Sequence, residues 1–215
     1  MPNDDWCRRT TWTADDQRAF AERNRRSRGA DSKAQYIRIQ AETLCQTGDP
    51  QLVVSALELL EQSFTDYPNS FDCAQSYECA ARCCEELDRI DDAIAYYRRA
   101  LEREKQFPGI RTNACFQFAR LVATELRHDS FDEVIAAVDS FGHPVFPWHA
   151  YMSNGPKALI AHERGDTASA KAFAEAALDA SGVRDSGLGW GRGDIGIVSD
   201  LETRMHRKLQ KLAGA

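Results

Sequence analysis

The chain has 215 residues, of which 43% are hydrophobic and 28% charged, and its formal net charge is −6. This composition is typical of a soluble globular protein, and the absence of a run of 18 apolar residues argues against a membrane span. The acidic balance argues against a nucleic-acid partner, which would require a broad basic surface.

The charge is unevenly distributed along the chain. Residues 1–40 and residues 201–215 carry +3 each, so the stretch between them carries −12. An acidic surface of this kind suits a basic partner, because complementary charge steers association. The alternative is that the central helices simply present solvated acidic faces.

All regular elements indicated by the sequence are helices. Thr13, with Asp16 three residues later, predicts the start of a helix over 14–28, whose basic C-terminal run suits the helix dipole. Helices are predicted over 33–46 and 52–64. They are separated at Gly48-Asp49-Pro50, because proline cannot continue a helix.

The stretch from Ala80 to Leu101, AARCCEELDRIDDAIAYYRRAL, has the strongest pattern in the chain. It predicts two amphipathic helices joined by a tight polar turn. Small residues recur where the two helices must touch, at Ala81, Ala93 and Ala100, and Tyr97 follows Ala93 by one turn. In period and residue type this segment resembles the core of a tetratricopeptide (TPR) repeat.

The resemblance extends over residues 33–180. The helices at 33–64 form an earlier pair, those at 112–127 and 131–141 a pair with Val134 in place of the expected alanine, and 156–180 a last pair. The resemblance implies an all-α, right-handed solenoid of antiparallel helix pairs with about ten helices.

Residues 142–156, GHPVFPWHAYMSNGP, contain three prolines and two glycines. Such a segment predicts a long connection in place of a helix. Long loops with aromatic residues are often functional, so Trp148 and Tyr151 are candidates for partner contact. The alternative is that the loop folds over the core as a lid.

Residues 181–215 are predicted to complete the chain as a glycine-rich connection followed by a capping helix over 199–212. No strand precedes the glycines and no Gly-Lys-Ser/Thr follows them, which argues against a phosphate-binding loop. A closing helix is expected because the last repeat of a solenoid otherwise exposes its stacking face. With residues 1–32 as an N-terminal helical segment on the first repeat and 33–180 as the helix pairs, we expect one continuous domain.

The seven cysteines are interpreted as small buried hydrophobic residues. Their odd number argues against a complete disulfide framework, and no CxxC pair indicates a zinc site. Reduced cysteines favour a cytoplasmic location. Cys83 or Cys84 could act as a nucleophile, but nothing places a base beside either. The sequence therefore predicts no metal, no cofactor and no enzyme activity.

In TPR-like stacks the first helix of each pair lines the concave surface, so the resemblance implies a candidate partner-binding groove there. Its residues are Arg38, Glu42, Gln75, Glu78, Arg82, Glu85 and Phe116. The lysines and asparagines with which the family clamps a peptide carboxylate are absent from matching positions.

We therefore expect a non-catalytic scaffold or adaptor that binds a protein or peptide, with a basic partner suggested by the acidic groove. One alternative is a cognate inhibitor, of the immunity-protein type, that blocks a basic toxin or enzyme. Another is an enzyme that uses the cysteine-rich helix.

Overall fold

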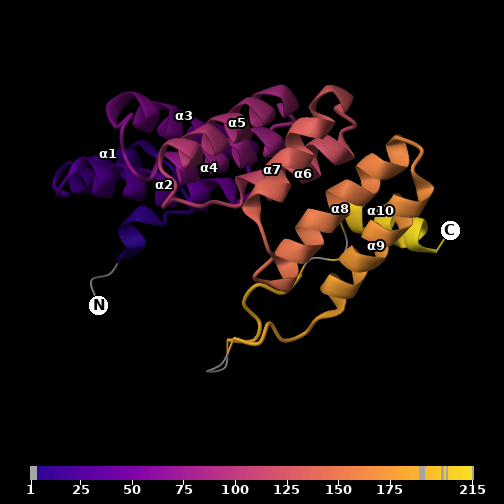
Figure 1. The fold of residues 1–215 in the computed structure, drawn as a ribbon. Coiled ribbons are helices and arrows are strands. Elements are labelled where there is room, and N and C mark those ends of the chain that lie inside the picture. The colour runs from indigo at the N-terminus through magenta and orange to yellow at the C-terminus, as the bar shows by residue number, and fades with distance from the viewer. Residues whose placement is uncertain (1–3, 189–191, 200, 202, 215) are drawn as a thin grey trace. The chain divides into compact units, whose positions relative to one another are not determined.

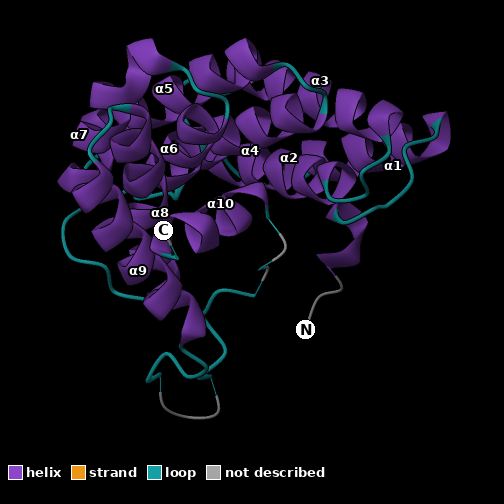
Figure 2. Ribbon diagram, turned by 90° about the vertical axis from the view of Figure 1, so that its right-hand side faces the viewer, coloured by secondary structure: helices purple, strands orange, loops and turns teal. Residues whose placement is uncertain are grey.

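The computed structural model describes residues 4–188, 192–199, 201 and 203–214. In this part of the chain the regular elements are ten α-helices and two short 3-10 helices, and no strand is present (Figures 1 and 2). None of these helices is long and apolar enough to cross a membrane. The all-α prediction is confirmed.

The helices fall into two compact units, Met1–Ala114 and Cys115–Ala215, which are described separately. The first holds η1 (Asp4–Cys7), α1 (Ala14–Arg25), α2 (Ala30–Cys45), α3 (Pro50–Asp66), α4 (Cys73–Glu86) and α5 (Ile90–Gln106). The second holds α6 (Ala114–Thr124), η2 (His128–Ser130), α7 (Phe131–Phe141), α8 (Pro147–Glu163), α9 (Thr167–Gly182) and α10 (Arg204–Ala213).

Two helices of the first unit, α1 and α3, begin with side-chain caps. The Thr13 hydroxyl accepts from the Asp16 N–H, while the Asp16 carboxylate accepts from the Thr13 N–H at 2.9 Å. This capping box satisfies two backbone donors at the start of α1. At α3, Asp49 caps the first turn and Pro50 occupies the first helical position, where its missing N–H carries no penalty.

The helices of the first unit pack as sequential pairs, α2 with α3 and α4 with α5, and α4 also contacts both helices of the preceding pair. The predicted small residues lie at these contacts. Ala81, Ala93 and Ala100 have no exposed surface, and the same holds for Ala41 of α2. Tyr97 is fully buried beside them, because the small alanine side chains leave room for its ring.

In the second unit α8 packs against α9, and α10 packs against both, as Figure 1 shows. The apolar side of α10 is buried through Met205 and Leu209. Gly155 of α8 lies where an added Cβ would meet the Met205 sulfur at 3.0 Å. Glycine at this position therefore permits the close approach of the two helices. The helix expected over 199–212 begins later, at Arg204, after a cap from Thr203.

The predicted loop over 142–156 is wrong, because α8 already begins at Pro147 and includes both Trp148 and Tyr151. Pro147 occupies the first helical position, and the Trp148 N–H is satisfied by the Gly196 carbonyl at 2.8 Å. Pro156 lies inside the helix and is fully buried. A helix-interior proline costs about 3 kcal/mol, which the packing of α8 against α9 and α10 must offset.

Other helices are shorter than predicted. The helix expected over 112–127 ends at Thr124, since Leu126 adopts a left-handed conformation with φ of 53°. The helix expected over 14–28 ends at Arg25, four residues before Gly29, whose φ is 79°. Local turn conformations of this kind are weakly encoded, which explains why helix ends are less predictable than helix cores.

Candidate functional site

Charged side chains from α2 and α4 meet on one side of the first unit. We call this surface the α2–α4 polar face and define it by Arg38, Glu42, Asp72, Gln75, Glu78, Arg82 and Glu104. Residues four positions apart share a side of a helix, which brings Arg38 beside Glu42 and Glu78 beside Arg82. Glu104 comes from the C-terminal part of α5.

Ion pairs connect the two helices across this face. Arg38 Nε lies 2.8 Å from Asp72 Oδ2, and its Nη1 lies 3.3 Å from Glu42 Oε2. The other Glu42 oxygen lies 3.2 Å from Arg82 Nη1. Three of the predicted site residues are thus brought together, with Glu42 held between two guanidinium groups.

Burial outweighs the local partners of three other carboxylates on this face, although Asp72 pairs with Arg38 and Glu104 accepts from the Thr112 N–H. Burial raises the pKa of Asp72, Glu78 and Glu104 from the ordinary carboxyl value. The negative charges of Glu104 and Glu42 further raise the pKa of Glu78, although the Asn113 N–H donates to its carboxylate at 3.2 Å. The face therefore holds negative charge that a cationic group would stabilise.

Gln75 lies on α4 one turn before Glu78 and is half-buried. Its Oε1 is shielded from solvent and has no hydrogen-bond partner among the described residues. A buried amide acceptor without a donor costs free energy, so a donor supplied by a partner would be favourable here.

Glu85 does not join this face as predicted. It accepts a hydrogen bond from Tyr97 Oη at 2.6 Å, which directs its carboxylate toward α5. The three-residue spacing from Arg82 placed Glu85 on the same helix side, but the tyrosine of the paired helix determines its orientation.

Phe116 is not exposed on a concave surface as predicted, because only 1% of it is accessible. Its ring lies 4.6 Å from Phe141, 5.2 Å from His149 and 5.7 Å from Trp148, measured between centroids. Phe116 is therefore a core residue of the second unit, and it positions α6 against α7 and α8.

His149 stacks on Phe116 with an interplanar angle of 14°. Its Nδ1 is buried and has no partner in the described part of the chain. Burial lowers the pKa of His149, so the neutral ring is favoured within the aromatic cluster.

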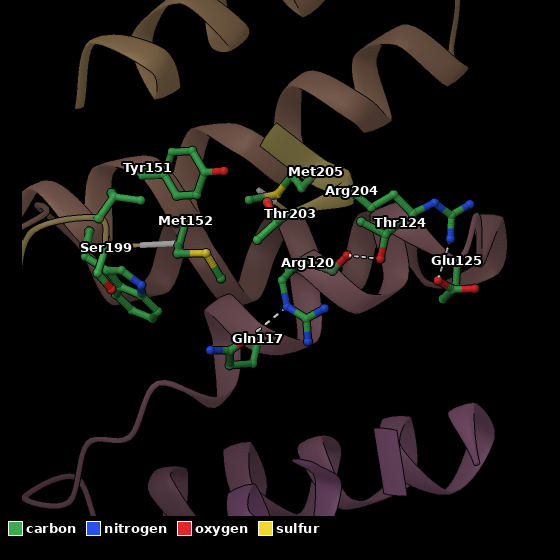
Figure 3. Close-up of a pocket in the computed structure, with 12 residues that line it drawn as sticks. Gln117, Arg120, Thr124, Glu125, Tyr151, Met152, Ser199, Thr203, Arg204 and Met205 are labelled. Atoms are coloured by element: carbon green, nitrogen blue, oxygen red, sulfur yellow. Dashed lines mark hydrogen bonds and ion pairs between the residues drawn. The ribbon is translucent and has the colours of Figure 1, made fainter. Parts of the chain in front are cut away.

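A second candidate site is an open cleft of about 490 Å³ between α6, α8 and the segment that leads into α10 (Figure 3). We call it the α6–α8–α10 cleft. Trp148, Met152 and Met205 provide apolar lining, and Arg120, Arg204 and Thr203 provide polar groups. Arg204 pairs with Glu125 at 2.9 Å. A cleft of this size and mixed lining can hold one or two side chains of a partner.

Both aromatic candidates of the predicted loop line this cleft, but they differ in accessibility. Trp148 is half-buried, whereas Tyr151 is 3% exposed and its Oη lies 3.4 Å from His206 Nδ1. Trp148 is therefore available for contact, while Tyr151 chiefly supports the floor of the cleft.

The cysteines are placed as predicted. All seven are buried thiols, none of them in a disulfide. Contacts with the thiols of Cys45 and Cys79 raise the pKa of Cys83, and burial raises that of Cys84 to about 11. Buried thiols with a raised pKa, such as those of Cys83 and Cys84, are poor nucleophiles.

Sequence reasoning missed Asp72 and Glu104 at the polar face. The signal for Asp72 was its position directly before α4, close to the helix N-terminus. Nothing in the sequence around Glu104 indicates that it joins this face, since its position depends on where α5 ends relative to α4.

Comparisons with protein-family models, with curated proteins and with solved structures find no significant match to this chain.

Proposed function

We propose that this chain is a non-catalytic binding protein with TPR-like helix pairs, and that the α2–α4 polar face binds a basic peptide or a basic segment of a partner protein. The sequential packing of α2 with α3 and of α4 with α5 supports the proposal, because it places the first helix of each pair side by side. The face then presents side chains from two helices to one extended ligand.

The observation that carries the proposal is the raised pKa of Asp72, Glu78 and Glu104. Burial disfavours the ionised form of each carboxylate, and the positive charge and hydrogen bonds around it do not fully offset this effect. A lysine or arginine side chain from a partner would offset that cost. Glu42 lies between two arginines, whereas Asp72 has one arginine partner and Glu78 and Glu104 accept from Asn113 and Thr112.

The test is to pan a displayed library of random dodecapeptides on the purified chain and on two charge-matched variants. In Glu78→Gln/Glu104→Gln the amides keep the acceptors for Asn113 and Thr112 but remove both charges. In Glu102→Gln/Glu175→Gln the same charge is removed from exposed positions outside the face. We expect enriched peptides to be rich in lysine and arginine and to bind the first variant about tenfold more weakly than the second.

Enrichment without a basic bias would contradict the proposal, as would equal binding to both variants. Replacing Trp148 with alanine is expected to leave these affinities unchanged, since the cleft that it lines belongs to the second unit. Loss of binding in the Trp148 variant alone would place recognition in the α6–α8–α10 cleft and overturn the assignment. An inhibitor of a basic toxin or enzyme would use the same acidic face.

A further inference from the structure

A cavity of about 460 Å³ lies in the first unit between α1, α2 and α3, away from the residues of the polar face. Its walls combine apolar and aromatic side chains, among them Trp12, Phe20 and Leu59. Both signs of charge line it, with Arg25 and Lys33 opposed by Glu58 and Asp66. The balance of charge gives no overall attraction for an anion or a cation, so the lining favours a neutral ligand.

Asn24 is the unusual residue of this cavity. It lies at the end of α1 between exposed arginines, yet it is only 7% exposed. Its Oδ1 is buried and has no hydrogen-bond partner within the described ranges. Buried side-chain amides are nearly always paired, because an unpaired one loses its bonds to water without replacement. The unpaired Asn24 oxygen therefore suggests a ligand that carries a hydrogen-bond donor.

From this cavity we infer a second binding site, for the amide group of a peptide-like ligand that carries an apolar side group. A carboxamide and a peptide group are complementary, since each has one N–H donor face and one carbonyl acceptor. Once the Asn24 side chain turns its amide toward the cavity, the ligand N–H donates to Oδ1, while the ligand side group packs against Phe20, Leu59 and the Trp12 ring. The site does not rest on the proposed function, because none of its residues belongs to the α2–α4 polar face.

The experiment follows backbone amide resonances of the ¹⁵N-labelled chain during titration with N-acetylphenylalaninamide. We expect saturable shifts at Phe20, Asn24, Ile37 and Leu59. The fully N-methylated analogue, which has the same side group but no N–H donor, is expected to bind about tenfold more weakly, in line with the loss of one hydrogen bond. A capped pentapeptide with phenylalanine at its centre distinguishes the two kinds of ligand. If it binds more tightly than the single residue, the ligand is a peptide segment, and if the two bind equally, the ligand is a small amide.

Two variants separate a ligand role for Asn24 from a structural one. Asn24→Leu replaces the unpaired amide with an apolar group of similar size, so the melting temperature should stay the same or rise while binding falls about tenfold. Gln51→Leu makes a comparable change at an exposed position outside the cavity, and it should alter neither the melting temperature nor the binding. The inference is overturned if no probe shifts these resonances, if the N-methylated analogue binds as well as the amide, or if Asn24→Leu lowers the melting temperature and leaves binding intact.

Discussion

Replacing Phe116 with alanine should lower the free energy of unfolding by about 3–5 kcal/mol, the usual cost of deleting a fully buried aromatic ring. The ring is 1% exposed and contacts Phe141, Trp148 and His149, so the substitution leaves a cavity at the junction of α6, α7 and α8. Urea unfolding followed by circular dichroism measures the change.

The matched control is Phe71→Ala, in which the same side chain is removed from a position that is 59% exposed. It should cost less than about 1 kcal/mol, as surface substitutions usually do. If Phe116→Ala cost no more than this control, the ring would not be part of the core and its assignment as a partner-binding residue would return.

Tyr97 gives the second large effect. Its ring has no exposed surface, and its hydroxyl donates to Glu85 at 2.6 Å. Tyr97→Ala should cost about 3–5 kcal/mol, because it opens a cavity between α4 and α5 and also leaves Glu85 without this donor. Tyr97→Phe keeps the ring and should cost about 1.5 kcal/mol, the scale of one hydrogen bond to a charged acceptor.

Denaturant unfolding of the two Tyr97 variants separates packing from hydrogen bonding. Similar losses for both would show that the hydroxyl dominates, which would contradict the interpretation of Tyr97 as the residue that fills the space beside Ala93. A Glu85→Gln variant keeps an acceptor for the Tyr97 hydroxyl but removes its charge, so it should cost less than Tyr97→Phe.

The paired helices around Ala81 and Ala93 could be predicted because small residues at fixed spacing report a close helix contact directly. Residues 142–156 could not, since their helix depends on distant groups. The Gly196 carbonyl satisfies the Trp148 N–H, and Met205 packs where Gly155 has no side chain. The prolines and glycines of this segment have low helix propensity, but propensity does not reflect these tertiary contacts.

The burial of Phe116 could have been predicted from the sequence. Helix α6, ACFQFARLVAT, is apolar on nearly all sides, and such a helix is surrounded by protein. Assigning it an exposed concave face relied on the repeat resemblance. Arg38, Glu42 and Arg82 were placed correctly together, because α2 and α4 are amphipathic and their polar sides meet.

The central claim is that the α2–α4 polar face binds basic ligands through carboxylates with raised pKa. Calorimetric titration of an enriched basic dodecapeptide between about pH 5 and about pH 7 tests it most directly. A cationic ligand favours the ionised carboxylates, so affinity should rise with pH and binding should release protons at the acid end of this range. Glu78→Gln/Glu104→Gln should weaken binding and flatten the dependence. Affinity that is independent of pH, or an unchanged profile in that variant, would contradict the account.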